Sequence, residues 1–285
     1  MRRLILFSFL ASAFAVFFTG CSRNNEELDK AAIRTLVDTD TVWFNLNTTV
    51  DSTGTSSTLM DTTKGIIWLR GPQTHDSATA LIEVVGDSAW VEWSRHNYGK
   101  IGILALVGME TKDTLVVWEK DLVETAKVRG IYRRTGSESD SNRGWTLEKI
   151  SCAVASSEGY STVNIDSFNV KSQDYDLTIT DPLNTFYDIA TLVTFHSGEN
   201  VIVTLYANKA ETDAFIHSFI LAWPFYVRAP FANQGNGVHE GTWHAQLAPF
   251  PRFAILDLLA HSTLWTEAGV YDFSGILFPY NIVWP

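Results

Sequence analysis

The chain has 285 residues, of which 46% are hydrophobic and 19% charged, and it contains 10 Trp, 9 Tyr and 17 Phe. This composition is typical of globular proteins with a large aromatic core and excludes an intrinsically disordered chain. The formal net charge of −11, without a cluster of Lys and Arg, argues against electrostatic binding to nucleic acid or to anionic lipid surfaces.

The first 21 residues have the pattern of a secretion signal that ends in a cysteine. Two arginines precede an uncharged apolar run over residues 4–18, which is followed by Thr19-Gly20-Cys21. An apolar run of roughly 15 residues is short for a membrane-spanning helix, so we predict that residues 1–20 are a cleaved signal peptide. Cleavage removes two arginines and no acid, which takes the net charge from −11 to −13.

The end of this leader, Thr19-Gly20-Cys21, resembles the lipobox of bacterial lipoproteins. The resemblance implies that the Cys21 thiol is diacylglycerated and that the lipid holds the protein at the bacterial cell envelope. Ser22 is similar to the residue found after the cysteine in lipoproteins sent to the outer membrane, facing the periplasm or the cell surface. We therefore expect membrane contact through an N-terminal lipid, with an envelope protein or a surface polymer as partner.

Residues 21–30 are predicted to form a lipidated tether, and helical spacing runs from Glu26 to Asp38. Leu28, Ala32 and Leu36 make an apolar stripe, while acids in the first turn favour the helix dipole. The Ser/Thr/Asp/Gly-rich segment 48–63 is predicted to be a loop.

Asp38 and Asp40 follow this helix and are candidate general bases, with His96 as the third candidate catalytic residue. An apolar pocket raises the pKa of a carboxyl group and tunes it for proton transfer. The alternative is that the two aspartates terminate the helix, because Asp side chains bind nearby backbone amides. His96 lies in the polar segment Ser94–Asn97, which is predicted to be a turn.

From Ile66 onward the pattern alternates as in strands. One helix followed by an antiparallel meander implies a curved sheet packed on that helix. This order, with the short segments Gly86–Val91 and Gly144–Ile150, resembles the NTF2-like cone fold. We predict an α+β domain of this kind over residues 31–155. The expected strands are 66–69, 80–85, 89–94, 101–107, 115–118, 123–135 and 145–154.

The length suits one large domain or two ordinary ones, and the small polar segment 156–161 is a plausible boundary. Short strands with regular turns follow it almost to the end of the chain, as in sandwiches. The segment Thr266–Phe273 resembles the tyrosine-corner stretch of immunoglobulin-like domains, which implies that the Tyr271 hydroxyl binds backbone. We predict an immunoglobulin-like β-sandwich over residues 162–285.

His239, Glu240 and His244 form the one local cluster with ligand chemistry. The helical zinc motif needs histidines four apart, whereas these are five apart. Residues five apart on a strand point to opposite faces. We therefore expect no metal and no cofactor, with zinc at these three residues as the alternative.

Cys152 has no partner if Cys21 carries lipid, because the chain contains only these two cysteines. An apolar alternating segment surrounds Cys152, so we expect a small buried hydrophobic side chain. His217 lies in a similar segment and is predicted at the core or its edge.

No sequence feature requires catalysis, and we predict a lipid-anchored envelope protein that acts as a non-catalytic binding or structural module. The alternative is a small-molecule-binding or hydrolytic NTF2-like domain tethered to the envelope. The aromatic segment Ala222–Phe253 is a further candidate binding surface, unless it only covers an open sheet edge.

Overall fold

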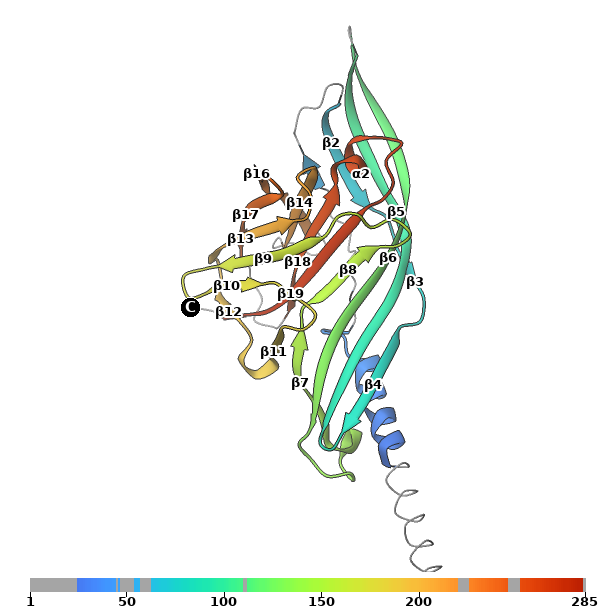
Figure 1. The fold of residues 1–285 in the computed structure, drawn as a ribbon, viewed down its shortest axis with the longest axis vertical. Helices are drawn as coiled ribbons and strands as arrows, with labels where there is room; N and C mark the ends of the chain where they lie inside the picture. Colours follow the sequence, from blue (N-terminus) through green and yellow to red (C-terminus); the bar gives the residue numbers. More distant parts are fainter. Residues whose placement is uncertain are drawn as a thin grey trace, which may run out of the picture.

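The computed structural model describes residues 25–44, 46, 54–56, 63–109, 112–219, 226–245 and 252–283. The predicted signal peptide over residues 1–20 and the predicted lipid site at Cys21 lie outside these described residues, as does most of the predicted loop 48–63. The described part of the chain is mainly antiparallel β-sheet, which confirms the predicted class (Figure 1).

The larger of two sheets contains strands from the whole length of the chain. These are β1 (Gly54–Ser56), β2 (Thr63–Arg70), β3 (Thr74–His75), β4 (Thr79–Val85), β5 (Ser88–Met109), β6 (Lys112–Arg134), β7 (Trp145–Ser151), β8 (Ala153–Ser157), β11 (Phe186–Asp188), β12 (Thr194–His196), β14 (Thr212–Phe219), β15 (Tyr226–Pro230), β18 (Arg252–Ala260) and β19 (Phe273–Val283). Their order is β11-β7-β6-β8-β19-β18-β14-β15-β1-β2-β5-β3, with β4 beside β5 and β12 beside β19. An additional pairing of β5 with β6 closes this path into a ring.

Strands β5 and β6 form a long hairpin, paired in unbroken register from Ser88 opposite Arg133 to Met109 opposite Lys112. The sequence prediction of a turn at Ser94–Asn97 is wrong, because these residues continue β5. Arg95 and Asn97 point inward there and bind each other, with 3.0 Å between Arg95 Nε and Asn97 Oδ1. Polar residues that are buried inside a strand and bind one another therefore give the sequence the polarity of a turn.

The smaller sheet contains β9 (Ile165–Lys171), β10 (Asp176–Ile179), β13 (Asn200–Ala207), β16 (Ala232–Gly235) and β17 (Val238–His244), in the order β10-β9-β13-β17-β16. Its apolar side chains pack on those of β14, β18 and β19 to form a second core, which includes Phe168, Trp243 and Phe278. Cys152 is fully buried in this core, as predicted.

Helical segments are few in the described residues. Residues 25–39 form the predicted N-terminal helix, and α2 (His261–Trp265) precedes β19, while η1 (Ser141–Gly144) and η2 (Ile189–Thr191) are short 3-10 turns. Ile33 and Val37 are buried on the N-terminal helix, whereas Leu28 from the predicted stripe is exposed. None of the helices in the described ranges combines the length and the apolar character needed to cross a membrane.

Strand β8 joins the two halves of the chain, because it pairs with β6 on one side and with β19 on the other. Strands from both predicted units, residues 31–155 and residues 162–285, thus lie in one sheet (Figure 1). The division predicted near residues 156–161 runs through this continuous sheet, since Ser156 and Ser157 belong to β8.

Candidate functional site

A cluster of ionisable side chains is buried inside the ring of strands. It is built by five different strands and by the segment before β19. Asp257 is its centre, 2.5 Å from His217 Nε2 and 3.1 Å from Arg228 Nε through Oδ2, and 3.9 Å from Arg70 Nη2 through Oδ1. The members are Arg70 on β2, Glu124 on β6, His217 on β14, Arg228 on β15, Asp257 on β18, and Tyr271.

Arg70 links Asp257 to the second half of the cluster. Its guanidinium lies 3.3 Å from Glu124 and donates to the Tyr271 hydroxyl at 2.9 Å, and that hydroxyl in turn donates to Glu124. The resemblance to a tyrosine corner implied a bond from the Tyr271 hydroxyl to backbone, and the structure corrects this, since its partners are side chains. The planar guanidinium of Arg70 also lies over the Phe273 ring at 4.2 Å, which is a favourable cation–π arrangement.

Burial disfavours the charged form of every group in the cluster, and the neighbouring charges determine which groups remain ionised. Burial alone would raise the pKa of Asp257, but His217 and Arg70 hold it well below its ordinary value. Glu124 has a raised pKa because burial outweighs the attraction of Arg70. Burial lowers the pKa of Arg228 to about 10, so both guanidinium groups stay charged at neutral pH.

This cluster is suited to holding strands in place rather than to catalysis. Its side chains are sealed from solvent, with Arg70, Glu124 and Asp257 fully buried, so a substrate cannot reach them. A buried ion network of this kind strongly penalises any arrangement that separates its members. The five strands that carry its members are thus linked by side-chain interactions in addition to their backbone pairing.

The lowered pKa of His217 predicts how the free energy of unfolding depends on pH. Burial lowers its pKa to about 4, against the opposing effect of Asp257. Between the ordinary value of 6.5 and this value, the unfolded chain binds a proton that the folded chain does not, so acidification favours unfolding. We expect the free energy of unfolding to fall by up to about 3 kcal/mol from pH 6.5 to pH 4 through this group.

Urea denaturation at a series of pH values checks this expectation. The variant His217→Gln removes the titrating group, so its stability should change less than that of the wild type over the same range. His244→Gln is the matched control, because His244 is exposed on β17. An unchanged pH slope in His217→Gln would show that other groups cause the acid sensitivity.

The structure brings Asp38 and Asp40 to one depression but places His96 elsewhere. The depression has a volume of about 330 Å³ and is also lined by His75, Asp76 and Arg95. Asp40 Oδ1 accepts backbone N–H groups of Val42, Trp43 and Phe44 at 2.8, 2.5 and 3.1 Å. This is the geometry of an aspartate in a turn that follows a helix, since its side chain binds the backbone N–H groups of the residues after it.

His96 points to the outer face of β5. It is exposed there and binds Glu158, and its ring lies 3.4 Å from Thr125 Oγ1. It therefore does not line the depression that contains Asp38 and Asp40.

The three candidate zinc ligands do not converge. His239 is buried and 2.8 Å from Thr212 Oγ1, whereas Glu240 and His244 are exposed on β17. In the parts of the chain that the structure describes, no group of three or more His, Cys, Asp or Glu side chains could hold a metal ion.

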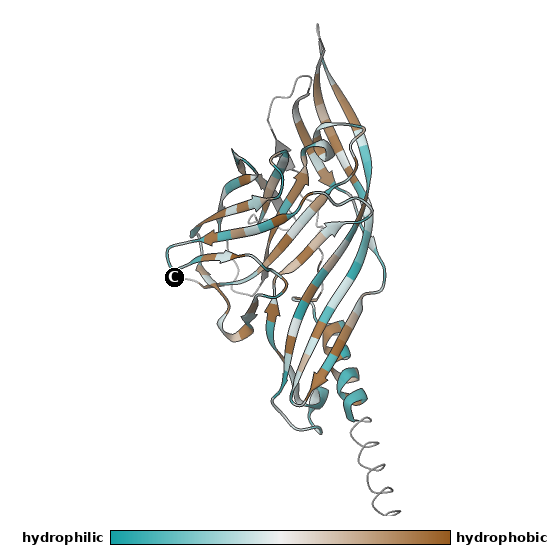
Figure 2. Ribbon diagram, in the orientation of Figure 1, coloured by the Kyte–Doolittle hydropathy of each residue, from teal (hydrophilic) through white to brown (hydrophobic). Residues whose placement is uncertain are grey.

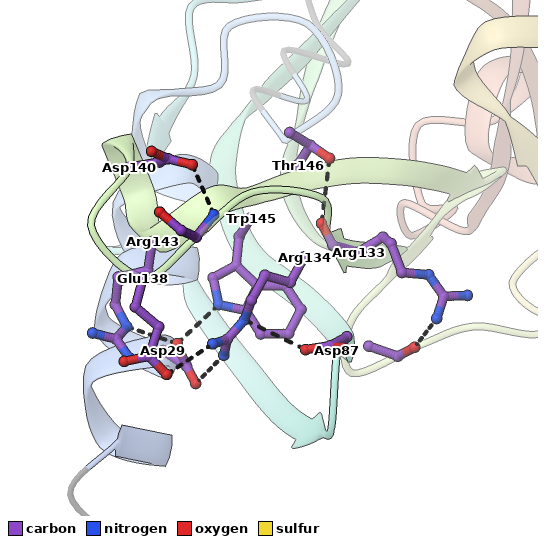
Figure 3. Close-up of polar contacts among 11 residues, drawn as sticks. Asp29, Asp87, Arg133, Arg134, Glu138, Asp140, Arg143, Trp145 and Thr146 are labelled. Carbon is purple, nitrogen blue, oxygen red and sulfur yellow. Dashed lines mark hydrogen bonds and ion pairs between the residues drawn. The ribbon is translucent and has the colours of Figure 1, made fainter.

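A second polar cluster attaches the N-terminal helix to the sheet (Figure 3). Asp29 accepts from Arg143 Nε at 2.8 Å and from Trp145 Nε1 at 3.0 Å, and it also binds Arg134. Glu138 lies 2.9 Å from Arg143 Nη2 and 3.2 Å from Arg134 Nη1. The Asp29 carboxylate is thus enclosed by donors from β6, η1 and β7.

The backbone of η1 is strained where it presents Arg143 to Asp29. Asn142 and Arg143 have φ values of 50° and 54°, a left-handed conformation that costs non-glycine residues roughly 1–2 kcal/mol each. Gly144 follows with φ 73°, and a Cβ there would lie 2.5 Å from the Gly136 backbone. The left-handed backbone of this turn is unfavourable, but it directs the Arg143 guanidinium toward Asp29 on the helix.

Sequence reasoning missed both clusters. A signal was present for the first, since Asp257 interrupts the apolar run Phe253–Leu259. For the second, Asp29 has the position of a first-turn acid, but it also lies four residues before Ile33 and eight before Val37, on the buried face of the helix. Comparison of the chain with family models, curated proteins and solved structures finds no match.

Proposed function

We propose that this chain is a lipid-anchored protein of the bacterial cell envelope whose β-sheet body binds a partner and does not catalyse a reaction. The leader ending in Cys21 supports the anchor. The sealed state of the central cluster and the helix-ending role of Asp40 support a non-catalytic body. An envelope protein or a surface polymer is the partner class that we propose, at the outer membrane in a species that has one.

The observation that carries the binding role is a row of apolar side chains on the outer face of the sheet. Ile67, Leu104 and Val117 lie opposite one another on β2, β5 and β6, and Leu69 and Leu115 extend the row, with Val117 69% exposed. Figure 2 shows the hydrophobic colouring of these strand ends, far from the N-terminal helix. Soluble monomers seldom expose contiguous apolar surface without a binding role.

The Asp29 cluster fits an anchored protein. The described helix begins at residue 25, four positions after Cys21, and Asp29 fixes its first turns to β6, η1 and β7. A force applied through the lipid therefore reaches the sheet through buried hydrogen bonds. The likeness of residues 31–155 to an NTF2-like cone and of residues 162–285 to an immunoglobulin-like sandwich stays a prediction.

Metabolic labelling with a fatty-acid probe tests the anchor. We expect the wild-type chain to take up the label and to fractionate with membranes, and Cys21→Ser to lose the label and leave the membrane fraction. Cys152→Ala is the matched control, because Cys152 is the other cysteine and is fully buried. Label that persists in Cys21→Ser would contradict the anchor.

A further inference from the structure

Strand β4 is an edge of the larger sheet. Within the described residues its single strand neighbour is β5, with Thr79 opposite Ser94 and Val85 opposite Ser88. Natural proteins protect such edges with lysine, proline, bulges or very short strands. The sequence of β4, TALIEVV, contains no lysine or proline, has Glu83 as its one charged residue and is rich in β-branched side chains. The strand is thus suited to pairing with a further strand.

The helix 25–39 contacts the start of this strand, and its Asp29 binds Arg134, which lies 3.8 Å from Asp87 just after the strand ends. Arg34 Nη2 donates to the Ala80 carbonyl, and the inward side chains Ile82 and Val84 pack on the core beneath. The outward side chains are exposed, with Leu81 at 72% and Val85 at 65%.

A shallow groove lies on the outer face of the sheet, over β4, β5 and β6. It has a volume of about 300 Å³ and is lined by Leu81, Glu83, Trp90, Glu92 and Arg129, among others. Trp90 lies opposite Glu83 and is 48% exposed, and its ring contacts Phe186 edge-on with centroids 5.3 Å apart. An aromatic side chain held in this way offers apolar contact area at a small entropic cost.

The groove carries one surplus negative charge. Arg129 is bound to Glu92 at 2.6 Å, and Arg133 lies 3.3 Å from Glu148, whereas Glu83 forms no ion pair within the described residues. The whole chain is also acidic, with a net charge of −11, which disfavours pairing with a second copy. The complementary ligand is therefore basic and apolar.

We propose that the free edge of β4 binds an extended segment of another protein, in which apolar and basic residues alternate, as an added strand of the sheet. Backbone hydrogen bonds to the β4 edge hold the segment, and contacts with the exposed side chains of Leu81 and Val85 select its apolar side chains. Glu83 pairs with a lysine or arginine of the segment. This inference rests on the proposed binding role and names the chemistry of its partner.

The probe for this site is an eight-residue peptide of alternating valine and lysine, blocked at both ends and fluorescently labelled. We expect it to bind the purified full chain in a fluorescence anisotropy titration, and the matching valine–glutamate peptide not to bind. Hydrogen exchange should slow in residues 79–85 when the peptide is added, since an added strand protects edge amides.

Glu83→Lys should weaken binding of the valine–lysine peptide by about tenfold or more, because like charges then face each other. Glu240→Lys is the matched control, since it makes the same charge change at an exposed position on β17 and should leave binding unchanged. Equal binding of both peptides, unchanged exchange in residues 79–85, or self-association of the chain through β4 in sedimentation would overturn the inference. Fatty-acid labelling of Cys21 in the same preparations separates its failure from a failure of the proposed anchor.

Discussion

Asp257→Ala is expected to lower the free energy of unfolding by about 3–5 kcal/mol. The substitution removes the acceptor shared by His217 and Arg228 and the carboxylate nearest to Arg70 after Glu124. Two buried guanidinium groups would then face a single carboxyl group, and a buried charge without its partner is far more costly than an exposed one. Guanidinium denaturation at pH 7, followed by tryptophan fluorescence, measures the loss.

Two variants separate the charge from the shape of this side chain. Asp257→Asn keeps the volume and one acceptor oxygen, so it should lose less stability than Asp257→Ala while still being destabilised. Glu240→Ala removes an exposed acid from β17 and should change stability by less than about 0.5 kcal/mol. If Asp257→Ala cost less than about 1 kcal/mol, the cluster would not be an ionised network that holds the ring together.

The sequence alone predicts the class of the fold and the N-terminal helix. The strands expected over residues 66–69 and 80–85 lie within β2 and β4, and their side chains alternate between more buried and more exposed positions, because successive side chains of a strand point to opposite faces. The helix predicted from Glu26 to Asp38 matches the observed residues 25–39.

The sequence pattern of a strand indicates which of its faces is buried, but it does not indicate which strand it pairs with. Alternation shows which side chains point inward, but it does not say that β8 pairs with β19, more than a hundred residues away. The continuous length of β5 could not be predicted for a related reason, since the polar residues Arg95 and Asn97 are buried inside and bind each other. A local pattern cannot distinguish such a pair from a solvent-exposed turn.

The candidate sites show the same limit. The sequence offers two interpretations of Asp40, as a helix-ending residue or as a base. The structure favours the first, and this could be expected because its three backbone contacts are local in sequence. Asp257 depends on partners from β2, β14 and β15 that are brought together only by ring closure. A lone acid in an apolar run signals a buried partner, but the identity of that partner is set by tertiary structure.

Asp29→Ala is expected to detach the N-terminal helix from the sheet and to cost about 3 kcal/mol or more. Burial would raise the pKa of Asp29, but hydrogen bonds from Arg143, Trp145 and Arg134 outweigh burial and hold the pKa below its ordinary value. This stabilisation is therefore complete above about pH 4 and is lost as the pH falls through the lowered pKa. Without the carboxylate, Arg134 and Arg143 would repel each other around Trp145, and the left-handed turn at Arg143 would lose its compensation.

Hydrogen exchange distinguishes local detachment from global unfolding. In Asp29→Ala, amides of residues 25–39 should exchange faster while those of β18 and β19 remain protected, because β18 and β19 also pack in the second core, to which the helix contributes no residue. Glu27→Ala is the matched control, since this exposed first-turn acid contacts only Lys30. Equal protection of the helix in both variants would mean that Ile33 and Val37 alone hold it, and the strained turn at η1 would then need another explanation.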